Sequence, residues 1–133
     1  MTTTIHTCEC ACGLVEIRCK GEPIHTSVCY CFECQKRTGS VFGVQARFEK
    51  ERVSLNGDVT RYIRVGDDGS EAQYEFCPSC GTTMRVLLSA LPNISVIPIG
   101  LFTDKEFHEP IISIYEQRTH GWVSFECTME HIE

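Results

Sequence analysis

The sequence predicts a mainly β fold: a single small domain of stacked antiparallel sheets with little helix. Three observations predict this class. Apolar residues recur with a period of two along most of the chain, the apolar runs are short, and no segment sustains an apolar stripe with helical spacing. The 133 residues, 42% of them hydrophobic, suffice for one ordinary core but not for two separate ones. We therefore expect one domain over residues 1–133.

Short alternating or apolar runs mark the expected strands. They lie at residues 15–19, 41–48, 53–55, 59–65, 72–76, 84–88, 94–100, 111–115 and 122–125. Asn56-Gly57, between the third and fourth of these runs, is typical of a two-residue turn, so a hairpin is expected there. A helical turn or two is expected at residues 34–38, and no longer helix elsewhere.

The charge balance disfavours two classes of partner. The net charge is -6, from 12 Lys and Arg against 18 Asp and Glu, which argues against binding to nucleic acid or to an anionic membrane. The N-terminus has neither the basic nor the apolar region of a secretory signal, and the longest nearly apolar stretch, residues 96–102, is too short to span a bilayer. We therefore expect a soluble cytoplasmic protein.

Ten cysteines are the most unusual feature of the composition. Without a secretory signal, such a density indicates metal binding or thiol chemistry before it indicates a disulfide framework. Most of them fall into three clusters: Cys8-Glu-Cys10-Ala-Cys12-Gly13, Cys29-Tyr-Cys31-Phe-Glu-Cys34 and Cys77-Pro-Ser-Cys80-Gly81. The glycines after Cys12 and Cys80 suit a backbone that turns sharply beside a metal.

The first and third clusters predict a structural zinc site. Structural zinc is normally held by four protein ligands in a tetrahedron, and Cys10, Cys12, Cys77 and Cys80 make a complete set. Such a site would join the N-terminal strands to a distant hairpin and contribute to folding directly. The alternative is four unrelated buried thiols.

The middle cluster predicts a different kind of site. Cys29, Cys31 and Cys34 are three ligands, and three ligands with an open position are typical of reactive zinc. A hidden fourth ligand, such as Cys8, Cys19 or a histidine, would instead make the site structural. Three thiolates leave zinc with a formal charge of about -1, which suits the binding of a further thiol better than the activation of water. The pattern therefore favours the making or breaking of carbon–sulfur bonds.

The flanking residues extend these clusters into a longer pattern. It consists of Cys10-x-Cys12-Gly13, Cys29-x-Cys31-x-x-Cys34 followed by Lys36-Arg37-x-Gly39-Ser40-x-Phe42, and Phe76-Cys77-x-x-Cys80-Gly81, and it continues through Gly100-Leu101, Phe107-x-x-Pro110 and Trp122. In order and spacing this pattern resembles the glutathione-dependent formaldehyde-activating (GFA) family over nearly the whole chain.

The resemblance implies a fold, an activity and two zinc sites. The fold is the β-tent type shared with centromere protein V, and the founding activity joins formaldehyde to glutathione as S-(hydroxymethyl)glutathione, a carbon–sulfur lyase reaction. The family's structural zinc matches Cys10, Cys12, Cys77 and Cys80, and its reactive zinc matches the catalytic Cys29, Cys31 and Cys34. Tyr30 and Ser113 stand where the family often has histidine.

Several alternatives stay open at this stage. Lys36 and Arg37 could bind the carboxylates of glutathione, or they could be a solvated basic pair. The first functional hypothesis is a zinc-dependent carbon–sulfur lyase or synthase. The second is a non-catalytic, zinc-stabilised β module that binds a protein partner, and the third is a redox or metal-storage protein. A homodimer is compatible with each of them.

Overall fold

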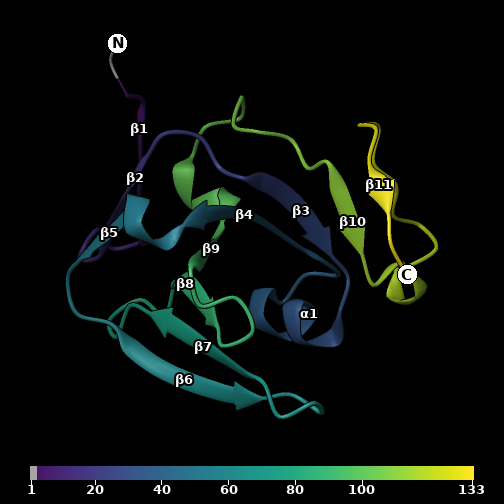
Figure 1. Ribbon diagram of the computed structural model, residues 1–133, viewed down its shortest axis with the longest axis horizontal. Helices are drawn as coiled ribbons and strands as arrows, with labels where there is room; N and C mark the ends of the chain where they lie inside the picture. The colour runs from purple at the N-terminus through teal and green to yellow at the C-terminus, as the bar shows by residue number, and fades with distance from the viewer. Residues whose placement is uncertain (1–2) are drawn as a thin grey trace.

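In the computed structural model, which describes residues 3–133, the strands form two sheets of unequal size (Figure 1). The small sheet has the strand order β1 (Ile5–Glu9), β2 (Glu16–Lys20) and β5 (Val53–Asn56). The large sheet has the order β11 (Glu130–His131), β10 (Ile112–Ile114), β3 (His25–Cys29), β4 (Gly43–Glu49), β9 (Ile94–Pro98), β8 (Thr83–Leu88), β7 (Glu71–Phe76) and β6 (Thr60–Val65). The mainly β fold with stacked sheets is confirmed.

Helix is scarce, as expected. The helix α1 spans Phe32–Thr38, and short 3-10 helices span Lys50–Arg52, Ile99–Phe102 and Glu116–Arg118. Gly39 follows α1 with a φ of 72°, a left-handed conformation that glycine adopts without strain and that commonly ends a helix. Over residues 3–133, no helix has the length and the apolar character needed to cross a membrane.

The main hydrophobic core lies where the small sheet packs on one face of the large sheet. Ile17 and Cys19 of β2 contribute to it from the small sheet, and Phe48 of β4 and Ile97 of β9 contribute from the large one. All four are fully buried. Because side chains alternate between the two faces of a strand, the neighbours of Phe48 and Ile97 along the chain point to the opposite face of the large sheet.

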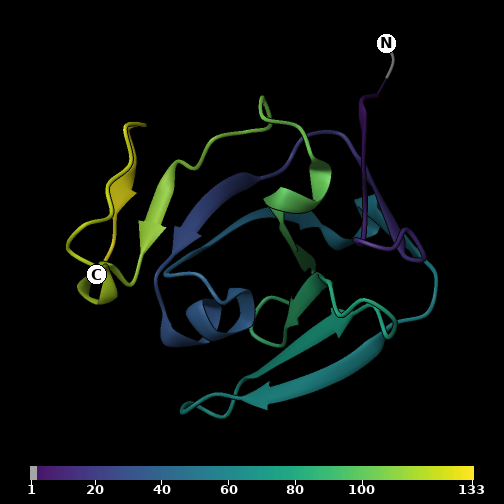
Figure 2. The same cartoon turned by 180° about the vertical axis from the view of Figure 1, so that it is seen from behind.

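That opposite face curves around α1 (Figures 1 and 2). None of the residues of α1 is buried, so the helix does not fill the space within the curve. A second, smaller apolar cluster lies on β7, β8 and β9 and consists of the buried residues Ala72, Val86 and Val96. The large sheet therefore has one face in the core and one face that borders α1.

The hairpin predicted around Asn56-Gly57 is wrong. The strand before it, β5, pairs with β2 in the small sheet, whereas the strand after it, β6, pairs with β7 in the large sheet. Gly57 has a φ of 115°, and a Cβ there would lie 2.5 Å from the carbonyl oxygen of Leu14. This glycine serves a close backbone approach where the chain crosses between the sheets.

Three further expectations about strands need correction. Residues 122–125 form no strand, and Trp122 is 75% exposed. The strands β1, β3 and β11 were not predicted, because their short and largely polar runs lack a clear alternation. The sheets are also not wholly antiparallel, since β10 runs parallel to both β3 and β11.

A buried ion pair lies on the core side of the large sheet. The Glu75 side chain is 2% exposed and accepts a hydrogen bond from Arg85 Nε at 2.6 Å. Its other carboxylate oxygen lies 3.1 Å from Gln73 Nε2 and 3.3 Å from Arg61 Nε. Three donors therefore compensate for the loss of water around this carboxylate.

We expect Glu75→Ala to lower the free energy of unfolding by about 3 kcal/mol, because it leaves the largely buried Arg85 without its partner. The control is Glu49→Ala, which removes an exposed pair with Arg52 and is expected to cost less than about 1 kcal/mol. Urea denaturation of zinc-saturated protein measures both. Equal losses in the two variants would contradict the role given to Glu75.

Candidate metal centres and the adjoining cavity

The first thiol cluster joins two turns that are far apart in sequence. Cys10 and Cys12 lie between β1 and β2, and Cys77 and Cys80 lie between β7 and β8. The Sγ atoms of Cys10 and Cys12 are 3.6 Å apart, those of Cys12 and Cys77 are 3.7 Å apart, and all four lie within 4.8 Å of one another. The structure thus brings together the four residues predicted as structural zinc ligands.

Local backbone geometry explains how each turn presents its sulfurs. In the first turn, the N–H of Val15 donates to Cys10 Sγ at 3.3 Å, and in the second the N–H of Ser79 donates to Cys77 Sγ at 3.4 Å. Gly13 and Gly81 have φ angles of 82° and 77°, as their predicted role in sharp turns requires. N–H donors directed at sulfur stabilise the thiolate form, which is the form that binds metal.

Thr82 links the two turns directly. Its Oγ1 accepts a hydrogen bond from the N–H of Ala11 at 3.1 Å and lies 3.2 Å from Cys80 Sγ. The contact with the Thr82 hydroxyl lowers the pKa of Cys80 to about 5. Tetrahedral zinc with Zn–S bonds of ~2.3 Å needs sulfurs roughly 3.8 Å apart, and the measured separations agree with that requirement. These four residues could hold a zinc ion.

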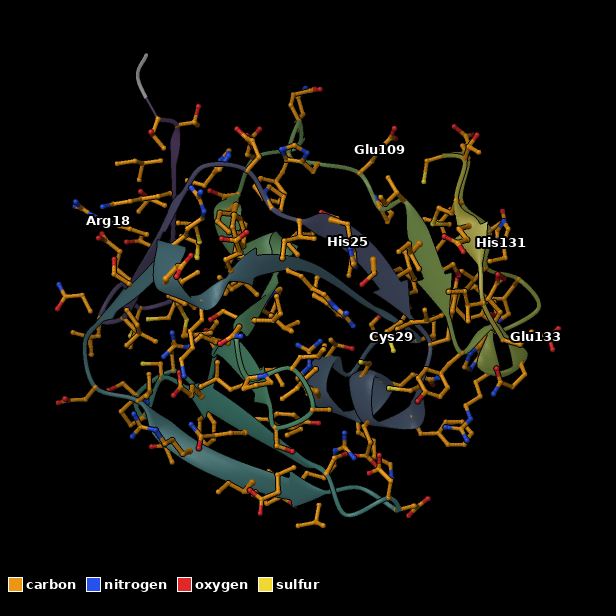
Figure 3. All side chains as sticks on the ribbon, viewed as in Figure 1. Arg18, His25, Cys29, Glu109, His131 and Glu133 are labelled. Carbon is orange, nitrogen blue, oxygen red and sulfur yellow. The ribbon has the colours of Figure 1, made fainter. Side chains whose placement is uncertain are left out.

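The second thiol cluster lies where β3 ends and α1 begins. Cys29 ends β3, Cys31 caps α1, and Cys34 lies in its first turn. Their Sγ atoms lie within 4.8 Å of one another, and within residues 3–133 no fourth Cys, His, Asp or Glu ligand joins this group. Figure 3 shows Cys29 beside α1. The cluster has three ligands, as the sequence predicted.

Charge in this cluster is concentrated on one sulfur. Contacts with the thiols of Cys29 and Cys34 lower the pKa of Cys31 to about 2, while the contact with Cys31 raises the pKa of Cys29. The N–H of Cys34 donates to Cys31 Sγ at 3.3 Å and supports the same thiolate. The donor set is therefore sulfur only and anionic, which suits zinc.

A cavity of about 250 Å³ adjoins this second cluster. It lies between α1 and the face of the large sheet that points away from the core. Its lining consists of Cys29, Cys31, Glu33, Cys34, Arg37, Gln45, Arg47, Arg64, Ala72, Tyr74, Val86, Leu88, Val96, Ile114 and Tyr115. The three thiols thus share one cavity with three arginines and a set of apolar side chains.

Two of the three arginines have no acidic partner. Over residues 3–133, neither Arg37 nor Arg47 has a carboxylate oxygen within 4.0 Å, whereas Arg64 lies 3.6 Å from Glu33. Arg37 donates to Gln45 Oε1 at 3.4 Å. The Nε atom of Arg47 is buried without a hydrogen-bond partner. A guanidinium without an acidic partner on the wall of a cavity could bind an anion.

Neighbouring residues hold these arginines in place. A Cβ on Gly43 would lie 2.9 Å from the guanidinium of Arg37, so the absence of a side chain there leaves room for it. Arg47 pairs across the sheet with His25, which Figure 3 labels on β3. Burial, together with the charge of Arg47, holds the pKa of His25 below its ordinary value. His25 therefore adds no competing positive charge at neutral pH.

The structure separates the two basic residues predicted to bind substrate. Arg37 lines the cavity, whereas Lys36 is exposed and does not line it. Sequence reasoning missed Arg47 and Arg64. The only signal for Arg47 was its place on the polar side of an alternating strand, a side that would ordinarily be assigned to solvent.

The remaining cysteines of the N-terminal strands lie apart from both clusters. Cys8 and Cys19 face the main core, and burial raises the pKa of each to about 12. Neither residue joins a thiol group, so neither is the hidden fourth ligand that the sequence left open for the second cluster. Both behave as small apolar residues.

Comparison with known proteins agrees with the arrangement of these clusters. The family model described as glutathione-dependent formaldehyde-activating enzyme matches residues 5–118. This chain belongs to the GFA family. A relative from Penicillium rubens that bears the family's name is 25% identical over 85% of this chain and 63% of its own length. Another, from Aspergillus terreus, is 32% identical over 58% of this chain and 40% of its own length.

The match to relatives is partial in length, and the match to structures concerns the fold. This GFA chain spans about three fifths of the length of the first curated relatives that it matches. The crystal structure of a Rhodobacter sphaeroides protein superposes with a TM-score of 0.57 at 20% identity, over 71% of this chain and 85% of that one. At this identity the comparison supports a common fold.

We expect two zinc ions per chain in protein purified without chelator, counted by native mass spectrometry. Cys77→Ser should lower the count to one and reduce thermal stability, because the first cluster joins the two sheets. Cys31→Ser should also lower the count to one, with a smaller loss of stability. Cys8→Ser is the control and should retain two. An unchanged count in Cys77→Ser would contradict the assignment.

Proposed function

We propose that this chain catalyses the reversible addition of glutathione, or a similar anionic thiol, to formaldehyde, as a zinc-dependent carbon–sulfur lyase. One observation carries the proposal: three thiols that lack a fourth ligand within residues 3–133 open onto a cavity that contains two unpaired arginines. The relatives named for glutathione-dependent formaldehyde activation support the same chemistry. In this proposal Cys29, Cys31 and Cys34 form the catalytic centre.

The thiol cluster and the arginines have separate roles. A zinc ion held by Cys29, Cys31 and Cys34 would supply a cation that favours the thiolate form of an incoming thiol. Arg37 and Arg47 bind the carboxylates of that thiol and orient its sulfur toward the cluster. In the addition, the sulfur–carbon bond forms, the carbonyl π bond breaks, and the thiol proton ends on the carbonyl oxygen.

The arrangement favours this enzyme over a module that only binds a protein partner. A purely structural second site would be closed by a fourth protein ligand, and none is present within residues 3–133. The cavity beside the thiols is concave and small, which suits a small molecule rather than a protein surface. We propose the first cluster, by contrast, as a closed structural zinc site.

The proposal has consequences for cellular context. A glutathione-dependent reaction and ten unpaired thiols both require a reducing compartment, and we therefore propose the cytoplasm.

We also propose that residues 1–133 act as one domain, because the ligands of the first cluster come from both sheets.

The reaction is tested by exchange NMR spectroscopy, because formaldehyde and glutathione also combine without a catalyst. The zinc-loaded protein should accelerate the interconversion of formaldehyde and S-(hydroxymethyl)glutathione above the uncatalysed rate. Cys31→Ser should lose this acceleration, whereas Cys8→Ser should retain it. A rate that equals the background with fully loaded protein would exclude the proposed function.

We expect Arg47→Ala to weaken glutathione binding about tenfold or more, because it removes charge-assisted hydrogen bonds to a carboxylate. Lys36→Ala is the matched control and should change the affinity less than twofold. Calorimetry with glutathione and its glycine ethyl ester separates charge from packing: the native protein should prefer the free acid, and Arg47→Ala should lose much of that preference. A variant that keeps the full preference would show that Arg47 contacts no carboxylate.

A further inference from the structure

The cavity has an apolar floor that neither formaldehyde nor glutathione requires. The register of the large sheet places Tyr74, Val86, Val96 and Arg47 in one row across β7, β8, β9 and β4. Ala72 and Leu88 form the next pair along β7 and β8. All six line the cavity. The row thus changes from apolar side chains at one end to a cation at the other.

This floor is distinct from the core of the molecule. Ala72, Val86 and Val96 form a cluster of their own, separate from the main core between the two sheets. They are 4% to 7% exposed, and the helix that faces them buries none of its own residues. The small remaining exposed area therefore faces the cavity and not a packed layer.

The helix is held above this floor at both of its sides. On one side, Glu33 lies 3.6 Å from Arg64 of β6. On the other side, Cys34 lies close to Gly43 of β4, where an added Cβ would be 3.4 Å from Cys34 Cβ. The space between α1 and β7 to β9 is thereby kept open, and the thiols of α1 border the same space as the floor.

The chemistry of the two reactants shows which of them needs this surface. Glutathione is polar along its length and carries two carboxylates, which match Arg37 and Arg47. Formaldehyde has no carbon substituent and gains nothing from an apolar floor. Apolar cavity surface next to a reactive group is typical of sites that bind an apolar part of a ligand. The reactant that packs on the apolar floor is therefore the carbonyl compound and not the thiol.

We propose that the carbonyl substrate of this chain is an aldehyde with a short alkyl or aryl substituent, which packs on the floor formed by Ala72, Val86 and Val96. The inference rests on the proposed function and extends its carbonyl partner from formaldehyde to larger aldehydes, which the chain prefers. The reaction is the same: the sulfur–carbon bond forms, the carbonyl π bond breaks, and the proton moves to oxygen. The cavity of about 250 Å³ limits the substituent to a short one.

The test compares aldehydes with one thiol. Exchange NMR spectroscopy measures how far the zinc-loaded protein accelerates the combination of glutathione with formaldehyde, pentanal and benzaldehyde over the uncatalysed rates. We expect the acceleration for pentanal and benzaldehyde to exceed that for formaldehyde by on the order of tenfold. This value is the lower end of the discrimination that one methylene group gives in an apolar pocket. Acceleration that is equal to or greater for formaldehyde overturns the inference and leaves the proposed function intact.

Variants of the floor supply a second readout. Ala72→Leu fills the space and should reduce the acceleration for pentanal about tenfold more than it reduces the acceleration for formaldehyde. Ala90→Leu makes the same change in an exposed turn and should alter neither. Val96→Ala enlarges the space and should shift the preference toward hexanal or longer aldehydes. Zinc count and circular dichroism confirm that each variant is folded.

The remaining outcomes are also decisive. If the protein accelerates the reaction of 6-mercaptohexanoate with formaldehyde more than the reaction of glutathione with pentanal, the floor binds an apolar part of the thiol. The inference is then wrong. If Ala72→Leu lowers the rates with formaldehyde and pentanal equally in a folded, zinc-loaded protein, the floor has no role in selectivity. If glutathione and formaldehyde combine at the uncatalysed rate in the presence of folded, zinc-loaded protein, the proposed function itself fails.

Discussion

Alternation of side chains along β4 underlies both the core and the site, because both faces of this strand are used. Ala46 and Phe48 point into the core between the sheets, and Gln45 and Arg47 point into the cavity. A shift of one residue in the pairing of β4 would exchange these two sets and place the Arg47 guanidinium in the core. The pairing of Arg47 with Val96 and of Ala46 with Ile97 fixes the alternation on β9 as well. The apolar packing of one face thus sets the position of the charges on the other.

The first thiol cluster adds a constraint that the hydrogen-bonded sheets do not provide. No strand pairing joins the small sheet to the large one within residues 3–133, so the two sheets are not held together by a ladder of backbone hydrogen bonds. Cys12 and Cys77 are 65 residues apart in sequence, and their sulfurs meet where a turn from each sheet ends. A metal held by all four thiols would close this long loop and fix one sheet on the other.

Sequence reasoning succeeded where the information was local. The spacing within each cysteine cluster and the glycines beside Cys12 and Cys80 predicted which thiols share a turn, because ligands in one turn are close whatever the rest of the fold does. The joining of the two distant turns followed from the four ligands that structural zinc requires. It failed at Asn56-Gly57, because turn residues specify a bend and not which strands pair beyond it. It missed Arg47 for a related reason. A polar residue on an alternating strand is ordinarily exposed, and only the topology shows that this face of β4 borders a cavity.

The two residues that stand where the family resemblance implies histidine do not line the cavity. Tyr30 and Ser113 are buried, and neither lines the cavity. The Tyr30 ring packs near Phe42, with ring centroids 6.3 Å apart. The backbone N–H of Tyr30 donates to the backbone carbonyl of Ile114 at 3.1 Å. Burial raises the pKa of the Tyr30 hydroxyl, which makes it a weaker proton donor than histidine in the same place. In the proposed reaction these departures bear on proton transfer near the cluster, whereas the proposed selectivity for the carbonyl partner depends on the separate floor of β7 to β9.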